Sequence, residues 1–233
     1  MKTIELDYSK QCAGEPEKGH NRWHPDIPPA VRADPGEEVV MQTRNALDGQ
    51  ITSTSQPADL LKVNLDLVHP LTGPVYVNGA EPGDLLEVTI LNIEPAKWGF
   101  TTILPGFGFL RDFFTEPYIV HWEMRDGFAR SEQLPGVRIP EASFMGTIGV
   151  APSRALRQEI LLREDELLRR AGMVVGPTPS GAVPSWEPFA SEGLRTIPPR
   201  ENGGNVDIKQ LTAGVRLILP VFTEGALFSA GDA

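Results

Sequence analysis

The sequence predicts a mainly β protein with some helix, an α+β chain in which short strands and turns dominate. Proline and glycine are abundant, with 22 and 23 copies in 233 residues, and both residues favour turns. The hydrophobic content is nevertheless 40%, which supports a packed core and argues against disorder. Many short segments alternate apolar and polar residues as strands do, whereas one stretch, after Ser153, has clear helical spacing.

Strand and turn signals alternate through the first part of the chain. Alternating side chains predict strands in residues 3–6, 37–43, 75–77 and 85–91. Asp48-Gly49 and the stretch 79–84 are turn signals. Residues 59–68 are ambiguous and are compatible with a short helix. Residues 97–124, rich in glycine and aromatic residues, are interpreted as a loop segment that covers an apolar pocket or a subunit contact.

The helix is predicted to begin after Ser153, whose side chain can cap its first turn. Gly172 is a plausible end, and the charged run 163–166 is expected to face solvent. Much of an apolar stripe comes from Leu156, Ile160, Leu167 and Leu168.

Tightly packed strands are expected on both sides of this helix. In residues 138–151, Gly146 and Gly149 would let a neighbouring backbone approach. Residues 215–222 are expected to form a buried strand, and another begins near residue 225.

Three segments are predicted from these patterns. Residues 1–152 would form a β-rich domain, and residues 153–202 the helix with a proline-rich excursion. Residues 203–233 would begin a C-terminal catalytic part. Because this part stops directly after an apolar strand, the chain is expected to be truncated or nicked, with the remainder missing or on a second chain.

Charge and cysteine content exclude several classes of partner. The net charge of −10 repels phosphate backbones, and no basic cluster offsets it, so nucleic acid is not expected as a partner. No apolar run reaches the ~18 residues of a membrane span. Residues 1–5 lack the apolar run of a secretory signal. With Cys12 as the single cysteine, the sequence predicts a cytoplasmic protein.

The stretch 203–209 (GGNVDIK) carries the densest candidate chemistry. Gly203 and Gly204 permit positive φ angles. If the following residues are extended, Asn205, Asp207 and Lys209 share one face. The alternative interpretation is an ordinary strand edge after a turn.

Histidines and paired acids leave further alternatives open. His20 and His24 lie on a proline-rich loop and either bind zinc or hydrogen-bond the loop in place. Glu81 and Asp84 either hold a cation or form a structural turn. His69 precedes a proline, so its backbone is held extended. Its side chain is either a ligand, a base or a packed ring.

Several separate blocks, in order, resemble the acetamidase/formamidase family. The resemblance covers the chain from near residue 19 to its end, and is carried by residues 19–29 (GHNRWHPDIPP), 48–50 (DGQ), 69–77 (HPLTGPVYV), 79–86 (GAEPGDLL) and 203–207 (GGNVD). It implies a β-sandwich fold, a cytoplasmic homo-oligomer, and hydrolysis of short carboxamides or γ-lactams to acid and amine. Val206 stands where formamidases often carry cysteine, which excludes a thiol nucleophile there.

The resemblance allows two mechanisms. In the first, a divalent metal, expected to be zinc, activates water. Its candidate ligands are Asp207, Asp232, His69 and Asp48. A histidine in the family pattern beyond residue 232 would complete the set. Glu81 is the candidate base. The candidate oxyanion donor is Asn205 or an N–H of the Gly203-Gly204 loop.

In the second mechanism a side-chain nucleophile is activated by a neighbour such as Lys209. Substrate contacts are predicted for Gly203 and Gly204. The aromatic residues hint at a pocket that accepts more than formamide: Trp98, Phe100, Phe107 and Phe109. Two other classes stay open, a β-sandwich that binds small ligands without chemistry and an inactive fragment of an amidase.

Overall fold

The computed structural model describes residues 1–170 and 176–232 and divides the chain into two compact units. The larger unit contains Met1–Gly49, Leu65–Asn92 and Phe144–Ala233, and the smaller contains Gln50–Asn64 and Ile93–Ser143. Short strands dominate, so the mainly β prediction is confirmed. Both predicted segment boundaries, after residues 152 and 202, fall inside the larger unit. In the described part of the chain, no helix has the length and apolar character needed to cross a bilayer.

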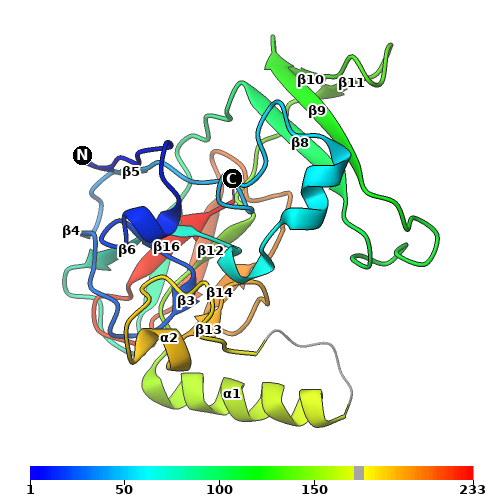
Figure 1. The fold of residues 1–233 in the computed structure, drawn as a ribbon. Helices are drawn as coiled ribbons and strands as arrows, with labels where there is room; N and C mark the ends of the chain where they lie inside the picture. The colour runs from blue at the N-terminus through cyan, green and yellow to red at the C-terminus, as the bar shows by residue number, and fades with distance from the viewer. Residues whose placement is uncertain (171–175, 233) are drawn as a thin grey trace. The chain divides into compact units, whose positions relative to one another are not determined.

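A six-stranded sheet forms the centre of the larger unit (Figure 1). Its strands run in the order β14-β12-β16-β6-β2, with β4 also paired to β6. The strands are β2 (Gly19–His20), β4 (Val31–Ala33), β6 (Leu71–Val77), β12 (Thr147–Gly149), β14 (Gly203–Asn205) and β16 (Phe228–Gly231). All neighbours are antiparallel except β4 and β6. Segments far apart in sequence therefore meet in one sheet.

Three two-stranded pairings complete the strands of the larger unit. They are β1 (Lys2–Ile4) with β5 (Val39–Met41), β3 (Arg22–Trp23) with β13 (Leu194–Arg195), and β7 (Leu85–Thr89) with β15 (Arg216–Pro220). Strand β15 was expected to be buried, and this is wrong for Ile218, which is 57% exposed. Successive side chains of a strand point to opposite faces, and in β15 Arg216 and Ile218 are on the exposed face whereas Leu219 is buried. Short 3-10 helices span Cys12–Gly14 and Leu65–Leu67.

Helix α1 (Arg154–Arg169) begins as predicted, because the Ser153 side chain accepts the Leu156 N–H. Its apolar stripe is only partly buried. Ile160 is completely covered, whereas Leu167 and Leu168 are 46% and 47% exposed. The predicted end at Gly172 lies outside the described residues.

The core beneath α1 joins three strands to the helix. Trp23 of β3, Leu71 of β6 and Leu194 of β13 pack with Ile160 in one buried cluster. Figure 1 shows α1 beside β13 and the short helix α2 (Phe189–Glu192). Leu71 therefore links the helix to the central sheet.

The charged run 163–166 was expected to face solvent, and this is wrong for Glu164. Its carboxylate is buried and accepts two hydrogen bonds from Arg200, with Nε–Oε1 2.6 Å and Nη2–Oε2 3.0 Å. Arg200 Nη1 also donates to the Arg195 carbonyl. These paired hydrogen bonds anchor the turn before β14 to helix α1.

His20 and Ser229 cross-link the central sheet over β6. Both are buried; His20 Nε2 lies 2.8 Å from Ser229 Oγ, and its Nδ1 lies 2.6 Å from the Arg22 carbonyl oxygen. They meet because Gly73, on the strand between them, has no side chain. A Cβ there would lie 2.9 Å from Ser229 Oγ. The hydrogen-bonding interpretation of His20 thus matches its contacts.

The smaller unit contains a four-stranded antiparallel sheet in the order β11-β10-β9-β8. Its strands are β8 (Trp98–Ile103), β9 (Tyr118–Arg125), β10 (Phe128–Arg130) and β11 (Arg138–Pro140). The 3-10 helix Pro57–Lys62 accounts for part of the ambiguous segment. His121 Nε2 lies 2.9 Å from the Ser55 carbonyl oxygen, and its ring stacks on Trp98.

The His20 environment predicts a pH-dependent stability. Burial lowers the pKa of His20 from 6.5 to about 4, so between these values the unfolded chain binds a proton that the folded chain does not. The free energy of unfolding should therefore fall by about 3 kcal/mol as the pH drops through this window. Denaturant titrations from pH 7 to pH 4 measure it. The His20→Gln variant should lose this component, and an unchanged pH slope would contradict the assignment.

Candidate active site

Four segments meet at one end of the central sheet. His69 lies two residues before β6 and Gly146 directly before β12, while Asp207 follows β14 and Asp232 follows β16. Because neighbouring strands are antiparallel, strand starts lie beside the ends of the adjacent strands. The sheet thus brings together an imidazole and two carboxylates from distant parts of the sequence.

Gly146 connects the two carboxylate-bearing segments. Its N–H donates to the Asp232 carbonyl at 2.9 Å, and its carbonyl accepts the N–H groups of Val206 and Asp207, each at 3.1 Å. A Cβ at residue 146 would lie 2.5 Å from the Asp232 carbonyl oxygen. It would also lie 3.3 Å from Asp232 Oδ2 and 3.4 Å from Asp207 Oδ1. Both carboxylates therefore approach the same space beside Gly146.

The imidazole of His69 faces Asp232. Nδ1 of His69 lies 3.3 Å from Asp232 Oδ2, and the two side chains are 15% and 29% exposed. The contact is close enough for an ion pair, but Nδ1 is buried and makes no hydrogen bond within the described structure. A buried ring nitrogen without a hydrogen bond is costly, and at this position it is available to a ligand or a metal.

Asp207 reaches the cluster through a turn of the backbone. The extended arrangement expected for Asn205, Asp207 and Lys209 is wrong, because β14 ends at Asn205 and Asp207 has a φ of 48°. Lys209 lies in an exposed turn. Asp207 is exposed, but its carboxyl is partly buried. This burial, and secondly the nearby Asp232 carboxylate, raise the pKa of Asp207, whereas His69 lowers it.

Asn205 is oriented by a neighbouring strand. Its Oδ1 accepts the Thr147 hydroxyl at 3.1 Å, and the two residues are paired in the β12–β14 register. With the amide oxygen engaged, the NH₂ group is the part of Asn205 that can donate to a ligand.

Gly203 and Gly204 lie within β14 and have φ angles of 87° and 99°. A Cβ at residue 203 would lie 2.6 Å from the Ile148 carbonyl oxygen. The N–H of Gly203 donates to the Arg200 carbonyl at 2.9 Å. In this structure, therefore, Gly203 fits β14 closely onto β12, and its N–H is already used by the preceding turn.

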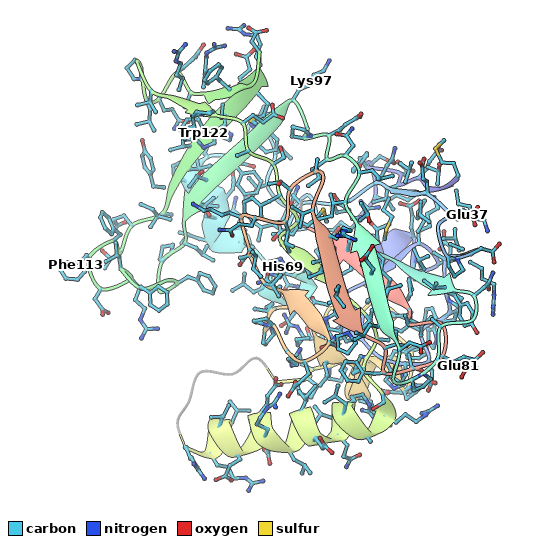
Figure 2. All side chains as sticks on the ribbon, turned by 180° about the vertical axis from the view of Figure 1, so that it is seen from behind. Glu37, His69, Glu81, Lys97, Phe113 and Trp122 are labelled. Carbon is cyan, nitrogen blue, oxygen red and sulfur yellow. The ribbon has the colours of Figure 1, made fainter. Side chains whose placement is uncertain are left out.

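Glu81 lies away from this cluster. It occupies the exposed turn beyond β6, and its N–H donates to Asp84 Oδ2 at 2.9 Å. His69 precedes the same seven-residue strand, so the strand separates the two by roughly 20 Å. Figure 2 shows Glu81 and His69 well apart. The structural-turn interpretation describes the contacts of Glu81.

Asp48 has different partners from those of Asp232. Both of its carboxylate oxygens lie 3.0 Å from the Cys12 amide nitrogen, and Arg44 Nε lies 3.8 Å from Oδ1. Arg44 also pairs with the buried Glu15. Asp48 therefore belongs to a buried network that ties the Cys12 turn to the chain near Arg44.

Trp98 and Phe107 both belong to the smaller unit. Trp98 is half-buried and stacks on His121, whereas Phe107 is 64% exposed. A cavity in this unit is lined by Ile103 and by residues 113–118, a set that includes neither of them. Phe113, labelled in Figure 2, lies on the loop between β8 and β9.

The donor types at the sheet end suit a divalent metal. An imidazole with a free buried nitrogen and carboxylates are the ligands that zinc takes. Within residues 1–170 and 176–232, however, no three His, Cys, Asp or Glu side chains are arranged to hold a metal ion together. His69 and Asp232 supply two donors of these types.

Sequence reasoning missed the residues that support the cluster. Thr147 orients Asn205, and Thr196 hydrogen-bonds the backbone of His69. Neither lies in a recognisable motif, and Thr196 is 127 residues from His69. Gly146 was recognised as a site of close backbone approach, but no local pattern indicated that its partners would be the two acidic segments.

A sequence model described as the Acetamidase/Formamidase family matches residues 5–233. The chain is 39% identical to an acetamidase from Mycolicibacterium smegmatis, covering 97% of this chain and 62% of that protein. It is 37% identical to a formamidase from Methylophilus methylotrophus, covering 100% and 61%. The chain thus spans about 60% of the length of these curated relatives.

A solved structure gives the same relationship. The gamma lactamase from Delftia acidovorans superimposes with a TM-score of 0.94 at 36% identity, covering 100% of this chain and 61% of that one. The fold expected from the sequence resemblance is therefore confirmed.

The backbone contacts of Gly146 predict that a single methyl group disrupts the site. Gly146→Ala would place Cβ against the Asp232 carbonyl, and such overpacking costs about 1–3 kcal/mol. Gly99→Ala is the matched control, because a Cβ there meets nothing within 4 Å. Thermal unfolding of both variants measures the difference. Equal stability of the two would contradict the proposed tight junction.

Proposed function

The chain belongs to the acetamidase/formamidase family, and from that premise we propose that it hydrolyses the C–N bond of short carboxamides or γ-lactams. The products are a carboxylic acid and ammonia from a primary amide, or an amino acid from a lactam. The names of the relatives, acetamidase, formamidase and gamma lactamase, support this substrate class. A lactam contains the same bond closed into a ring, so one site can attack both.

The observation that carries the proposal is the convergence of His69, Asp207 and Asp232 at one end of the central sheet. An unactivated amide requires an activated nucleophile, stabilisation of the oxyanion and a proton for the leaving amine. This group of side chains offers proton acceptors and donors within one small region. In the described part of the larger unit, the other predicted site acids, Glu81 and Asp48, have structural partners instead.

We assign the role of general base to Asp207, in place of Glu81. Its carboxylate approaches the space beside Gly146 that Asp232 also approaches, and a carboxylate there can accept a proton from water. The Asn205 NH₂, oriented through Thr147, is the proposed donor to the oxyanion. These two groups lie on either side of Val206, at the end of β14.

We propose that His69 and Asp232 bind a divalent metal, with zinc favoured by the imidazole and carboxylate donors. When bound, such an ion supplies an activated water near neutral pH and polarises the substrate carbonyl. Asp232 faces the free Nδ1 of His69, and Asp207 is left to act on the proton. Activation of a side-chain nucleophile by Lys209 is the competing route, and the exposed turn that holds Lys209 gives it no support.

A cytoplasmic homo-oligomer is the proposed working form. The single cysteine, Cys12, is buried and free. Burial is the main cause that raises the pKa of its thiol to about 12.

Several large side chains of the β8–β9 loop are exposed, including Phe109 and Phe113, and such surface is typical of subunit contacts. Light scattering of the purified chain measures the subunit number.

A substrate panel tests the proposed reaction. The chain is incubated with formamide, acetamide and a five-membered lactam, and ammonia or amino acid is measured. We expect turnover of at least one, and a loss of at least about 100-fold in Asp232→Asn. Asp126→Asn is the matched control, because Asp126 has the same φ of 52° and is exposed. A folded chain without turnover, or an Asp232→Asn variant that equals the control, would contradict the proposal.

Metal removal separates the two mechanisms. Treatment with a chelator should abolish hydrolysis, and added zinc should restore it, because water activation depends on the ion. Metal content is measured by mass spectrometry before and after treatment. Full activity of metal-free protein would exclude the metal route and favour a side-chain nucleophile.

A further inference from the structure

Thr196 holds the backbone of His69 on both sides of its Cα. The hydroxyl Oγ1 accepts the His69 N–H and donates to the His69 carbonyl, each at 2.8 Å. A hydroxyl has one proton to donate and lone pairs to accept, so this single side chain pairs both backbone polar groups of His69. Thr196 is 0% exposed, which shields both hydrogen bonds from competition with water.

The preceding residue, Arg195, fixes the segment that leads to His69. Its Nη2 donates to the Leu65 carbonyl at 2.6 Å and to the Val68 carbonyl at 3.5 Å. Its Nη1 lies 3.4 Å from Asp66 Oδ1. Arg195 is itself placed by β13, which pairs with β3. Arg195 and Thr196 therefore hydrogen-bond the segment 65–69 at both of its ends.

The chain after His69 is also confined. A Cβ at Gly231 would lie 2.5 Å from the Pro70 carbonyl oxygen, so the backbone after His69 lies directly against β16. Asp232, the partner of the His69 ring, directly follows that strand. With its backbone held by Thr196 and by β16, His69 has little freedom to move relative to Asp232.

We propose that Thr196 is a positioning residue that sets where the His69 imidazole meets Asp232. The proposal rests on the function proposed above for these two residues. The hydroxyl of Thr196 bonds the backbone of His69, so Thr196 acts through that backbone. Supporting hydrogen bonds of this kind change activity by roughly 10- to 100-fold when removed, because small displacements of a reacting group are costly.

Two substitutions at Thr196 separate the hydroxyl from the volume of the side chain. Thr196→Val keeps the shape but loses both hydrogen bonds, whereas Thr196→Ser keeps the hydroxyl. Thr72→Val is the matched control. Thr72 is a buried threonine of β6 whose Oγ1 donates to the Gln42 carbonyl at 2.6 Å. Thr72→Val removes one buried hydrogen bond between a threonine hydroxyl and the backbone, at a residue other than His69. General loss of stability should therefore appear in both valine variants.

In the amide hydrolysis assay, we expect kcat/KM of Thr196→Val to fall roughly 10- to 100-fold below that of Thr72→Val. Thr196→Ser should stay within a few-fold of the wild type. Thr196→Val activity equal to that of Thr72→Val would overturn the proposal, as would a Thr196→Ser variant as impaired as Thr196→Val.

A second readout does not depend on turnover. The chain has four histidines, so the ring signals of histidine-labelled protein can be resolved by NMR, and loss in His69→Gln identifies that of His69. The His69 signal should move in Thr196→Val and stay in place in Thr196→Ser and Thr72→Val. If the wild type hydrolyses no amide, the proposed function fails and this signal alone decides the positioning role. An unmoved signal in Thr196→Val overturns it.

Discussion

The close backbone contact at Gly146 is the constraint on which the arrangement of the site depends. Its N–H and carbonyl hold the Asp232 segment and the Asp207 segment at once. Any side chain would collide with the Asp232 carbonyl, 2.5 Å from the Cβ position. The contact requires glycine at residue 146, directly before a core strand, where an apolar side chain would otherwise bury more surface. As a result two carboxylates lie near each other, and the pKa of Asp207 is raised, first by partial burial of its carboxyl and then by the Asp232 carboxylate.

Side-chain contacts to the backbone, rather than regular secondary structure, hold the segments around this junction. Thr196 and Arg195 bind the backbone between residues 65 and 69, and Arg200 joins the turn before β14 to Glu164 of helix α1. Such bonds suit a chain rich in proline and glycine, because its irregular segments cannot pair all of their own polar groups. They also connect the helix to the site, since the same turn begins the strand that carries Asn205 to the cluster.

Burial decides which of several chemically plausible groups can take part. His20 and Ser229 have the spacing of a histidine-activated hydroxyl, with Nε2 and Oγ 2.8 Å apart. Both are sealed in the core, and burial keeps His20 neutral by lowering its pKa to about 4. A substrate cannot reach them, so their hydrogen bond serves the sheet. His69 and Asp232 are partly exposed, which is what the role proposed for them requires.

The sequence by itself determined the mainly β class, the Ser153-capped helix, the close packing at Gly146 and Gly149, and, through its motif blocks, the family. These properties reside in local spacing and in short ordered motifs, which a linear chain displays directly. Only the tertiary structure decided that His69, Asp207 and Asp232 meet while Glu81 and Asp48 turn elsewhere. Residues such as Thr196 and His69 are 127 positions apart. Their meeting depends on strand pairing across the whole larger unit, and no local pattern encodes which strand ends become neighbours.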